Sequence, residues 1–368
     1  MQPTVLKHTK NSPDPLASKS KVTTWARELG FATLGVTDTN LAIAEPKLRQ
    51  WLADQMHGSM DYLQRSVDQR LNPEQLVAGT KRVILVSMNY SPEDPAWIAA
   101  AWNNLKADEQ AYVSRYALGR DYHKVVRARL QKLVGLMQTD FGTFGYRVFC
   151  DSAPVMEVEL AQKAGLGWRG KHTLLLSKEQ GSSFFIGSIL TDLDLPIDAP
   201  VSDHCGRCTA CIDSCPTGAI VRPYVVDARL CISYLTIEHH GSILPELRTL
   251  MGNRIYGCDD CQLACPWNKF AQPMGVPDFA ARNQLDDIGL IALFKWDQTQ
   301  FEKRCEGSPI RRIGHERWLR NIAIALGNAK TLAPKLVMDA LNLHKNHSSD
   351  MVREHVQWAI DQQAARHA

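Results

Sequence analysis

The stretch HCGRCTACIDSCPTGAIV, residues 204–221, contains four cysteines, the last followed at once by proline. Cys205, Cys208 and Cys211 are each separated by two residues, a spacing that lets three thiolates bind three corners of one iron–sulfur cubane. The fourth, Cys215, follows a three-residue spacer, and the proline turns the chain away. In two-cluster ferredoxins a cysteine at this position ligates the other cluster. The stretch therefore predicts a second set of cysteine ligands elsewhere in the chain.

The second set lies about forty residues further on, in CDDCQLACPW at residues 258–267, which again ends its cysteine run in Cys-Pro. This motif has one cysteine fewer than the first, and Cys231, between the two motifs, makes good the shortfall. Cys150 and Cys305 are left free. The predicted crosswise assignment gives cluster one Cys205, Cys208, Cys211 and Cys265, and gives cluster two Cys215, Cys231, Cys258 and Cys261.

Two structural zinc sites are the alternative, since paired Cys-x-x-Cys motifs also bind zinc. Zinc, however, does not require a tight cysteine triplet followed by Cys-Pro. The double Cys-Pro pattern therefore favours two 4Fe-4S clusters, which together would conduct single electrons.

The whole chain has the composition of a multidomain enzyme of 368 residues. Its 42 Lys and Arg against 39 Asp and Glu are too balanced to predict a nucleic-acid partner from net charge. No apolar run of about twenty residues and no secretory signal is seen. We expect a soluble cytoplasmic protein, in which clustered cysteines bind metal rather than form disulfides.

Hydrophobic periodicity predicts an α+β protein in three parts after a mobile segment at residues 1–20. Residues 21–200 are expected to form a mixed α/β domain, with strands in TLGVT, RVILVSMNY, YRVF and SSFFIGSILTD and helices in TTWARELGF and DYHKVVRARLQKLVGLM. Residues 201–275 form the ferredoxin-type domain, and residues 276–368 are helical. In RWLRNIAIALGN, Gly327 and Asn328 are predicted to cap the helix C-terminus.

One glycine pattern, GLGWRG at residues 165–170, formally matches the dinucleotide-binding fingerprint. A helix-like segment precedes it and a strand-like segment follows, whereas a Rossmann loop runs from strand to helix. The glycines are better explained by close passage of the backbone past another flat or bulky ligand, or by a tight turn.

Two polar stretches are candidates for chemistry. In RYALGRDYHK, Asp121 could act only as a helix N-cap and His123 only as a surface histidine. In CDSAPVMEVEL, Asp151 follows a strand, where it could cap the next helix or face a ligand. Against an apolar ligand, the pKa of Asp151 would be raised, which would suit general acid catalysis.

Taken together, VSRYALGRDYHK, DSAPVMEVELAQKAGLGWRGKH, the two cysteine motifs with GNRIYGCDDCQLACPWN, and IRRIGHERWLRNIAIALGN closely resemble epoxyqueuosine reductases. The resemblance runs from roughly residue 20 to residue 365. It implies a cobalamin-binding N-terminal domain, two 4Fe-4S clusters and C-terminal HEAT-like helices that bind tRNA. Enzymes of this family reductively remove the epoxide oxygen of epoxyqueuosine at the wobble position of a tRNA anticodon.

The resemblance also implies residue roles. Asp151, in DSAP, matches the family's proton donor, and Asp121 and His123, in DYH, match positions near the substrate or cobalt. Cys150 stands where we expect an aliphatic residue, and a buried thiol need not change the chemistry. The implied cofactor-binding residues are Ser114, Asp151, Gly167, Trp168, Gly170, Lys171, Ser233 and Asp259.

Local charge fits a tRNA partner better than whole-chain charge does. Residues 111–134 contain six basic residues and one acid, and residues 301–330 contain seven basic and three acidic residues. Without the resemblance, a solvated basic face would be the preferred explanation. A wobble base can be splayed into a pocket, where Tyr122 or Trp168 could stack on it, although core packing is the alternative. The predicted tRNA contacts are Arg311, Arg312, Arg317 and Arg320.

Two other functions stay open at this point: a cobalamin-dependent reductase of a small molecule, such as a dehalogenase, and a non-catalytic ferredoxin-type electron carrier. The first has little need of a basic helical tail, and the second needs neither the large N-terminal domain nor Asp151. By the resemblance, the partners are tRNAs with Asp, Asn, His and Tyr type anticodons and an external donor such as a flavodoxin or ferredoxin. Nothing in the sequence requires more than a monomer.

Overall fold

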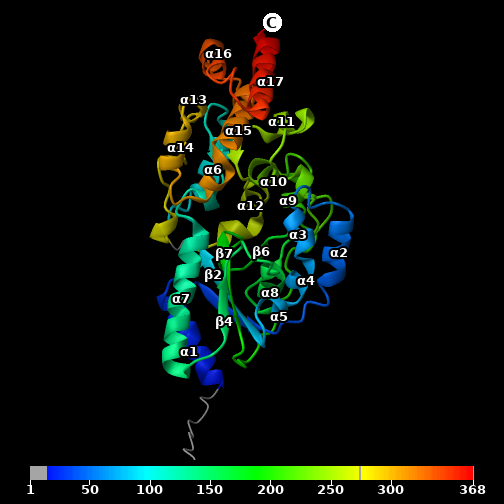
Figure 1. Ribbon diagram of the computed structural model, residues 1–368, viewed down its shortest axis with the longest axis vertical. Helices are drawn as coiled ribbons and strands as arrows, with labels where there is room; N and C mark the ends of the chain where they lie inside the picture. Colours follow the sequence, from blue (N-terminus) through cyan, green and yellow to red (C-terminus); the bar gives the residue numbers. More distant parts are fainter. Residues whose placement is uncertain (1–14, 273–274, 368) are drawn as a thin grey trace, which may run out of the picture.

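The computed structural model describes residues 15–272 and 275–367. The molecule is elongated, with a β-sheet near one end, helices at the other, and the cysteine-rich segment between them (Figure 1). Most of the predicted mobile segment, residues 1–14, lies outside the described residues. The predicted boundary at residue 20 falls inside the first helix, α1 (Pro15–Glu28). Among the described helices, none is both long and apolar enough to cross a membrane.

A four-stranded antiparallel sheet forms the N-terminal part, in the order β1–β2–β7–β4. Its strands are β1 (Thr33–Thr37), β2 (Arg82–Asn89), β4 (Tyr146–Phe149) and β7 (Phe184–Thr191), all four of which the sequence predicted. The run RVILVSMN makes β2 buried on both faces. Ile84 and Val86 pack on the side of α1 and α7 (Tyr122–Phe141), while Val83 and Leu85 pack on the side of α8 (Glu157–Lys163).

Shorter elements complete this part of the molecule. They are α2 (Glu45–Ala53), α3 (Asp61–Arg65), α4 (Val67–Leu71), α5 (Pro73–Leu76), α6 (Trp97–Lys106), β3 (Tyr112–Val113), η1 (Arg115–Ala117), β5 (Trp168–Arg169) and β6 (Leu175–Leu176). The cysteine-rich segment contains only short elements. They are α9 (Ala210–Asp213), η2 (Ala228–Leu230), α10 (Ile232–Ile237), α11 (Pro245–Met251), β8 (Arg254–Tyr256), α12 (Asp260–Leu263) and η3 (Pro266–Phe270).

The C-terminal part is helical, as predicted. After η4 (Pro277–Phe279) come α13 (Leu290–Phe294), α14 (Gln298–Arg304), η5 (Pro309–Ile313), α15 (Gly314–Asn328), α16 (Pro334–Asn342) and α17 (Asp350–His367). Helix α15 lies at the centre of this bundle and is buried over most of its length. The HEAT-like arrangement of these helices stays a prediction.

The core does not follow the predicted boundary at residue 200. Strand β3, from the N-terminal part, pairs in parallel with β8 of the cysteine-rich segment. Ala111, Val113 and Leu118 are buried in the same cluster as residues of α15 and α17. The segment around β3 therefore belongs by packing to the C-terminal core, although it precedes the cysteine motifs by about ninety residues in the sequence.

The predicted cap at Gly327 and Asn328 is wrong, because both residues lie inside α15 and Ala329 follows as the cap. Gly327 is required for packing instead. A Cβ atom there would lie 2.5 Å from the Trp358 ring and 3.0 Å from the Cα of Ala359. Glycine thus lets α17 approach α15 closely.

This packing gives a stability prediction. Gly327→Ala should lower the free energy of unfolding by about 1–3 kcal/mol, because overpacking outweighs the gain in helix propensity. Gly135→Ala is the matched control, since Gly135 is exposed in α7 with open space around it, and it should be neutral or stabilising by up to about 1 kcal/mol. Urea unfolding of both variants measures the difference. A stabilised Gly327→Ala protein would contradict this account of the α15–α17 contact.

Candidate functional site

The eight central cysteines form two groups in space. In the first, burial raises the pKa of Cys211 to about 11, and the neighbouring thiols of Cys265, Cys205 and Cys208 add to the effect. Cys265 comes from the second motif, yet its neighbours are the cysteines of the first. The structure thus brings together the four residues assigned to cluster one, with Cys265 crossing over.

The second group lines a cavity of about 480 Å³. All four residues assigned to cluster two, Cys215, Cys231, Cys258 and Cys261, contribute to its wall. Burial raises the pKa of Cys261 well above its ordinary value, and Cys231 and Cys215 are the next largest influences. The fourth cysteine of the first motif therefore faces the second group.

The geometry bears on the zinc alternative. None of the ten cysteines forms a disulfide bond. Four sulfurs bound to one zinc ion lie about 3.8 Å apart, given a Zn–S distance of about 2.3 Å. Within the described ranges, no three His, Cys, Asp or Glu side chains converge tightly enough to hold a single metal ion. Neither cysteine group is therefore arranged as a tight tetrahedral zinc site among the described residues.

Asp151 lines the same cavity as the second cysteine group. It follows β4 and adopts a left-handed backbone conformation with φ of 61°, which costs energy for a residue other than glycine. Its backbone N–H points at Glu157, whose two carboxylate oxygens each lie 3.1 Å from the nitrogen. Asp151 is not the N-cap of α8, since Met156 holds that position. The strained loop leaves 58% of the Asp151 side chain exposed, toward the cavity.

Two residues at the start of α7 hold the Asp151 carboxylate. The Tyr122 hydroxyl donates to Oδ2 of Asp151, and Nε2 of His123 lies 3.2 Å from the same oxygen. The Tyr122 ring stacks on Phe185 with a centroid distance of 4.3 Å, so core packing fixes its position. In this structure Tyr122 is therefore both a packed aromatic residue and a wall of the cavity.

Asp121 is the N-cap of α7 and also contacts the His123 ring. Its side chain caps α7 by accepting the His123 N–H, and its Oδ1 also lies 2.7 Å from Nδ1 of His123. Arg312, from η5, reaches Oδ2 of Asp121 at 3.3 Å and Nε2 of His123 at 3.1 Å. The result is a continuous polar chain from Arg312 and Asp121 through His123 to Asp151.

The rise in the pKa of Asp151 expected against an apolar ligand stays a prediction, and the protein groups around Asp151 act in the opposite direction. Burial alone raises this pKa, but hydrogen bonds from His123 and Tyr122 outweigh it, and the pKa of Asp151 is lowered. Burial likewise lowers the pKa of His123, yet contacts with Asp121 and Asp151 raise it overall. At neutral pH Asp151 is therefore ionised, and its carboxylate favours the protonated form of His123.

Ser114, Ser233 and Asp259, predicted to bind the cofactor, do line the cavity. Asp259, however, is already saturated by protein groups. Its carboxylate accepts the Ser114 hydroxyl, the Tyr112 hydroxyl at 2.9 Å and the Arg115 N–H at 2.7 Å. Its side chain thus joins the Cys258–Cys261 turn to the segment after β3.

The role of the glycine loop in cofactor binding stays a prediction. Gly167, Trp168, Gly170 and Lys171 are not among the residues that line the cavity, and Trp168 packs against Cys205 and Cys265 of the first cysteine group. Lys171 donates to the carbonyl oxygens of Gly206 and Cys208, each at 2.8 Å. Trp168 is fully buried against His204, Trp267 and Cys265. The residues that follow, 172–175, line the cavity instead.

The four predicted arginines separate into different environments. Arg320 is fully buried and binds the carbonyl oxygens of Leu235, His239 and Gly241, so its prediction as a tRNA contact is wrong. Arg317 is half-buried and also binds backbone carbonyl groups. Arg311 is exposed, with Glu302 4.0 Å away, and Arg312 is about half exposed beside Asp121. A dense run of arginines in sequence therefore does not form one surface.

Sequence reasoning missed two residues of the cavity wall, Glu157 and His172. His172 is buried, its Nδ1 accepts the Leu174 N–H at 3.1 Å, and burial lowers its pKa to about 4. Its Nε2 has no partner among the described residues. Both residues lie inside quoted motifs, but nothing in their spacing indicates which side chains face a ligand.

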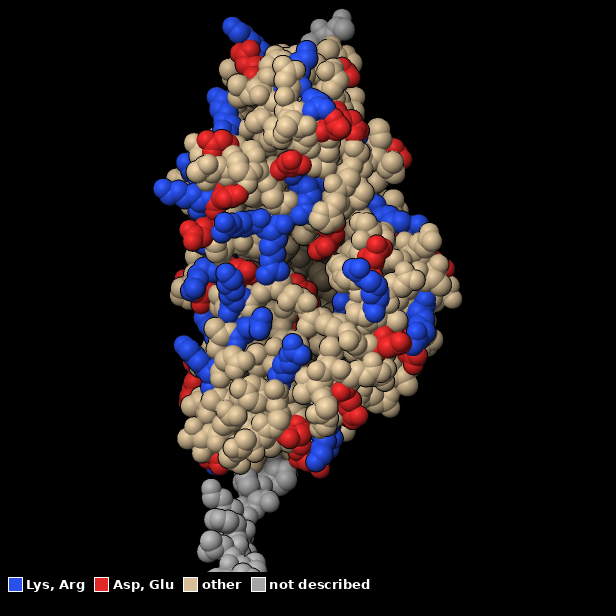
Figure 2. Space-filling model, in the orientation of Figure 1, with Lys and Arg blue, Asp and Glu red and all other residues tan. Residues whose placement is uncertain are grey.

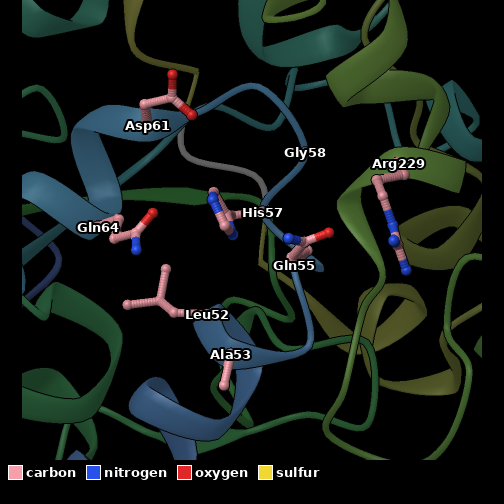
Figure 3. Close-up of a pocket in the computed structure, with 8 residues that line it drawn as sticks. All are labelled: Leu52, Ala53, Gln55, His57, Gly58, Asp61, Gln64 and Arg229. Atoms are coloured by element: carbon pink, nitrogen blue, oxygen red, sulfur yellow. The ribbon is translucent and has the colours of Figure 1, made fainter.

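A second pocket, of about 460 Å³, lies between the α2–α3 connection and Arg229 (Figure 3). Its other lining residues are Leu52, Ala53, Gln55, His57, Gly58, Asp61 and Gln64. None of the predicted site residues contributes to it. The cavity beside the second cysteine group is therefore the candidate active site.

The polar chain gives a pH-dependent prediction. Asp121→Asn keeps a good N-cap for α7 but removes the negative charge beside Nδ1 of His123, so the pKa of His123 should fall. NMR titration of the imidazole resonances measures this pKa. Asp140→Asn is the control, since Asp140 pairs with Lys21 on the surface. An unchanged or raised His123 pKa in Asp121→Asn would contradict the arrangement.

Comparison with known proteins identifies two matching family models. The model described as "Epoxyqueuosine reductase QueG, DUF1730" matches residues 70–152, and that of the "4Fe-4S double cluster binding domain" matches residues 204–268. The second range contains all eight central cysteines. The chain therefore has a domain that binds 4Fe-4S clusters.

Whole-chain relatives agree with these models. The epoxyqueuosine reductase of Xanthomonas campestris pv. campestris is 54% identical over 350 residues, covering 95% of this chain and 97% of the relative. That of Pseudomonas aeruginosa is 50% identical over 361 residues, covering 98% of both chains. A crystal structure of an epoxyqueuosine reductase with an epoxyqueuosine-modified tRNA-Tyr stem loop has the same fold, with a TM-score of 0.78 and 21% identity over 95% of this chain and 100% of that chain. Since the high identity extends over nearly the whole sequence, this chain belongs to the epoxyqueuosine reductase family.

Proposed function

We propose that this protein reduces epoxyqueuosine to queuosine at the wobble position of tRNA anticodons of the Asp, Asn, His and Tyr type. One observation carries the proposal: a single cavity is lined both by the second cysteine group and by Asp151. An electron-transfer centre and a proton-transfer group thus meet at one place, as a reductive loss of oxygen requires. The family membership and the tRNA-bound relative support the substrate.

Cobalamin is the cofactor that we assign to this cavity. Aromatic and aliphatic residues form much of the cavity wall, as in many sites that bind flat or bulky ligands. The unpartnered Nε2 of His172 fits an uncharged hydrogen-bond acceptor of a ligand. Ser114, Ser233 and His172 would contact the corrin, and the bound cofactor would supply reduced cobalt to the epoxide-bearing ring.

Electrons would enter at the first cysteine group. Of the ten cysteines, only Cys208 is exposed. An external flavodoxin or ferredoxin can therefore approach cluster one closely, whereas cluster two adjoins the cavity. Because Cys215 and Cys265 each join the cluster of the other motif, the two clusters lie next to each other. The electron path therefore runs from the donor to cluster one, then to cluster two and the cavity.

Asp151 would deliver a proton to the epoxide oxygen. Because Asp151 is ionised at rest, it acts as a relay that receives the proton from His123 at 3.2 Å. Asp121 and Arg312 orient the imidazole from its other side. Tyr122 holds the carboxylate that makes the transfer.

The tRNA would approach the face shown in Figure 2, where a hollow lies near the middle and Lys and Arg side chains gather along one side of it. Arg311 and Arg312 are the exposed arginines of η5 that we assign to phosphate contacts. Splaying the wobble base out of the anticodon loop would bring it into the cavity. We place the enzyme in the cytoplasm as a monomer.

The proposal is tested on protein reconstituted anaerobically with iron, sulfide and cobalamin and supplied with epoxyqueuosine-containing tRNA. Mass spectrometry of the nucleosides should show the loss of one oxygen. Asp151→Asn should lower the rate by about 10²–10⁴-fold, because it removes the proton relay, whereas the surface variant Asp140→Asn should match wild type. An unchanged nucleoside with the wild-type enzyme would refute the function. A fully active Asp151→Asn enzyme would refute only the role of Asp151.

A further inference from the structure

If the protein reduces epoxyqueuosine as proposed, the cavity must supply two protons in each turnover. Converting an epoxide to an alkene breaks two C–O bonds and releases the oxygen as water. This step consumes two electrons, supplied singly by the low-potential external carrier through the clusters, and two protons. The Asp151–His123 pair can supply at most one proton at neutral pH, because Asp151 is ionised. A second proton must come from another group.

Glu157 is the other carboxyl group placed to supply it. It is in the first turn of α8, lines the same cavity as Asp151 and lies against the Asp151 backbone, with both carboxylate oxygens 3.1 Å from the N–H. The only carboxyl groups besides these two in the described cavity wall are Asp259 and Asp260. Asp259 is saturated by hydrogen bonds, and Asp260 forms a buried ion pair with Arg254. Neither is free to pass a proton.

The surroundings shift the pKa values of Glu157 and Asp151 in opposite directions. Burial raises the pKa of Glu157 to about 8, and the negative charge of Asp151 adds to the rise. Besides Asp151, the titratable groups that act on Glu157 are His123 from α7, Arg70 from α4 and the Cys150 thiol. Pairs of acids whose pKa values are driven apart characterise proton-transfer sites. At pH 7 Glu157 is protonated while Asp151 is not.

We propose that Glu157 stores the second proton of the reaction and passes it to Asp151. The first proton moves from His123 through Asp151 to the epoxide oxygen as the first C–O bond breaks. The two electrons go to the carbon that is released, and the oxygen stays on the ring as a hydroxyl group. The proton of Glu157 then recharges the Asp151 carboxylate. Asp151 delivers it to the hydroxyl oxygen as the second C–O bond breaks, the electron pair on the neighbouring carbon forms the C=C bond, and water leaves. Glu157, now a carboxylate, and His123 regain their protons from solvent between turnovers.

The variant Glu157→Gln isolates the proton from the structural contact, since its amide oxygen can still accept the Asp151 N–H. The control is Glu246→Gln, the same change in the exposed first turn of α11. Turnover on epoxyqueuosine tRNA is measured from pH 6 to pH 9.5 with the reconstituted holoenzyme. The wild-type rate should fall as the pH rises through about 8, where Glu157 loses its proton. Glu157→Gln should lose about 10²-fold in kcat and lack the step near pH 8, keeping only the fall that follows deprotonation of His123, with KM for tRNA unchanged.

Infrared difference spectroscopy gives a second, activity-independent measurement on the same proteins. Wild type and Glu246→Gln should show a protonated carboxyl band at pH 7 that disappears near pH 8, and Glu157→Gln should lack it. Active wild type together with a Glu157→Gln enzyme of equal kcat and unchanged pH profile would overturn the inference alone. A wild-type enzyme that leaves the tRNA unchanged would overturn the proposed function and the inference with it.

Discussion

The crosswise grouping of eight thiols is the constraint on which the rest of the site depends. Cys215 leaves the first motif to join the second group, and Cys265 leaves the second motif to join the first. Each motif is therefore tied to both groups, so the two groups must lie side by side. Because the second group also forms a wall of the cavity, the same exchange places an electron path next to Asp151.

A second contact fixes this wall to the rest of the molecule. The buried carboxylate of Asp259, between Cys258 and Cys261, accepts hydrogen bonds from Tyr112, Ser114 and the Arg115 backbone. Burial raises its pKa, and these bonds offset the cost of keeping a carboxylate in the interior. The parallel pairing of β3 with β8 supports the same junction. The cavity is thus assembled from distant segments held together by buried polar contacts.

The sequence predicted what depends on local pattern. Short apolar segments indicated the four sheet strands, and cysteine spacing with the two Cys-Pro pairs indicated the crossed groups that the structure brings together. It failed where the outcome depends on distant partners. Arg320 is buried because carbonyl groups near α10 surround it, and Gly327 permits the approach of α17. The glycine loop was a correct signal of close packing, since Cβ atoms at Gly165 and Gly167 would lie 2.6 Å from the carbonyl oxygen of Ala199 and 2.0 Å from that of Leu176.

Iron content and electron paramagnetic resonance of single cysteine variants test the crossed grouping most directly. Anaerobically reconstituted wild type should hold about eight irons. Each variant that lacks one of the eight central cysteines should hold about four. Cys265→Ser should retain the same reduced-cluster signal as Cys205→Ser, while Cys215→Ser should match Cys231→Ser. Cys305→Ser, which removes a buried thiol outside both groups, should keep both signals. A Cys265→Ser protein whose remaining signal matches that of Cys258→Ser would show that each motif binds its own cluster, and would contradict the account.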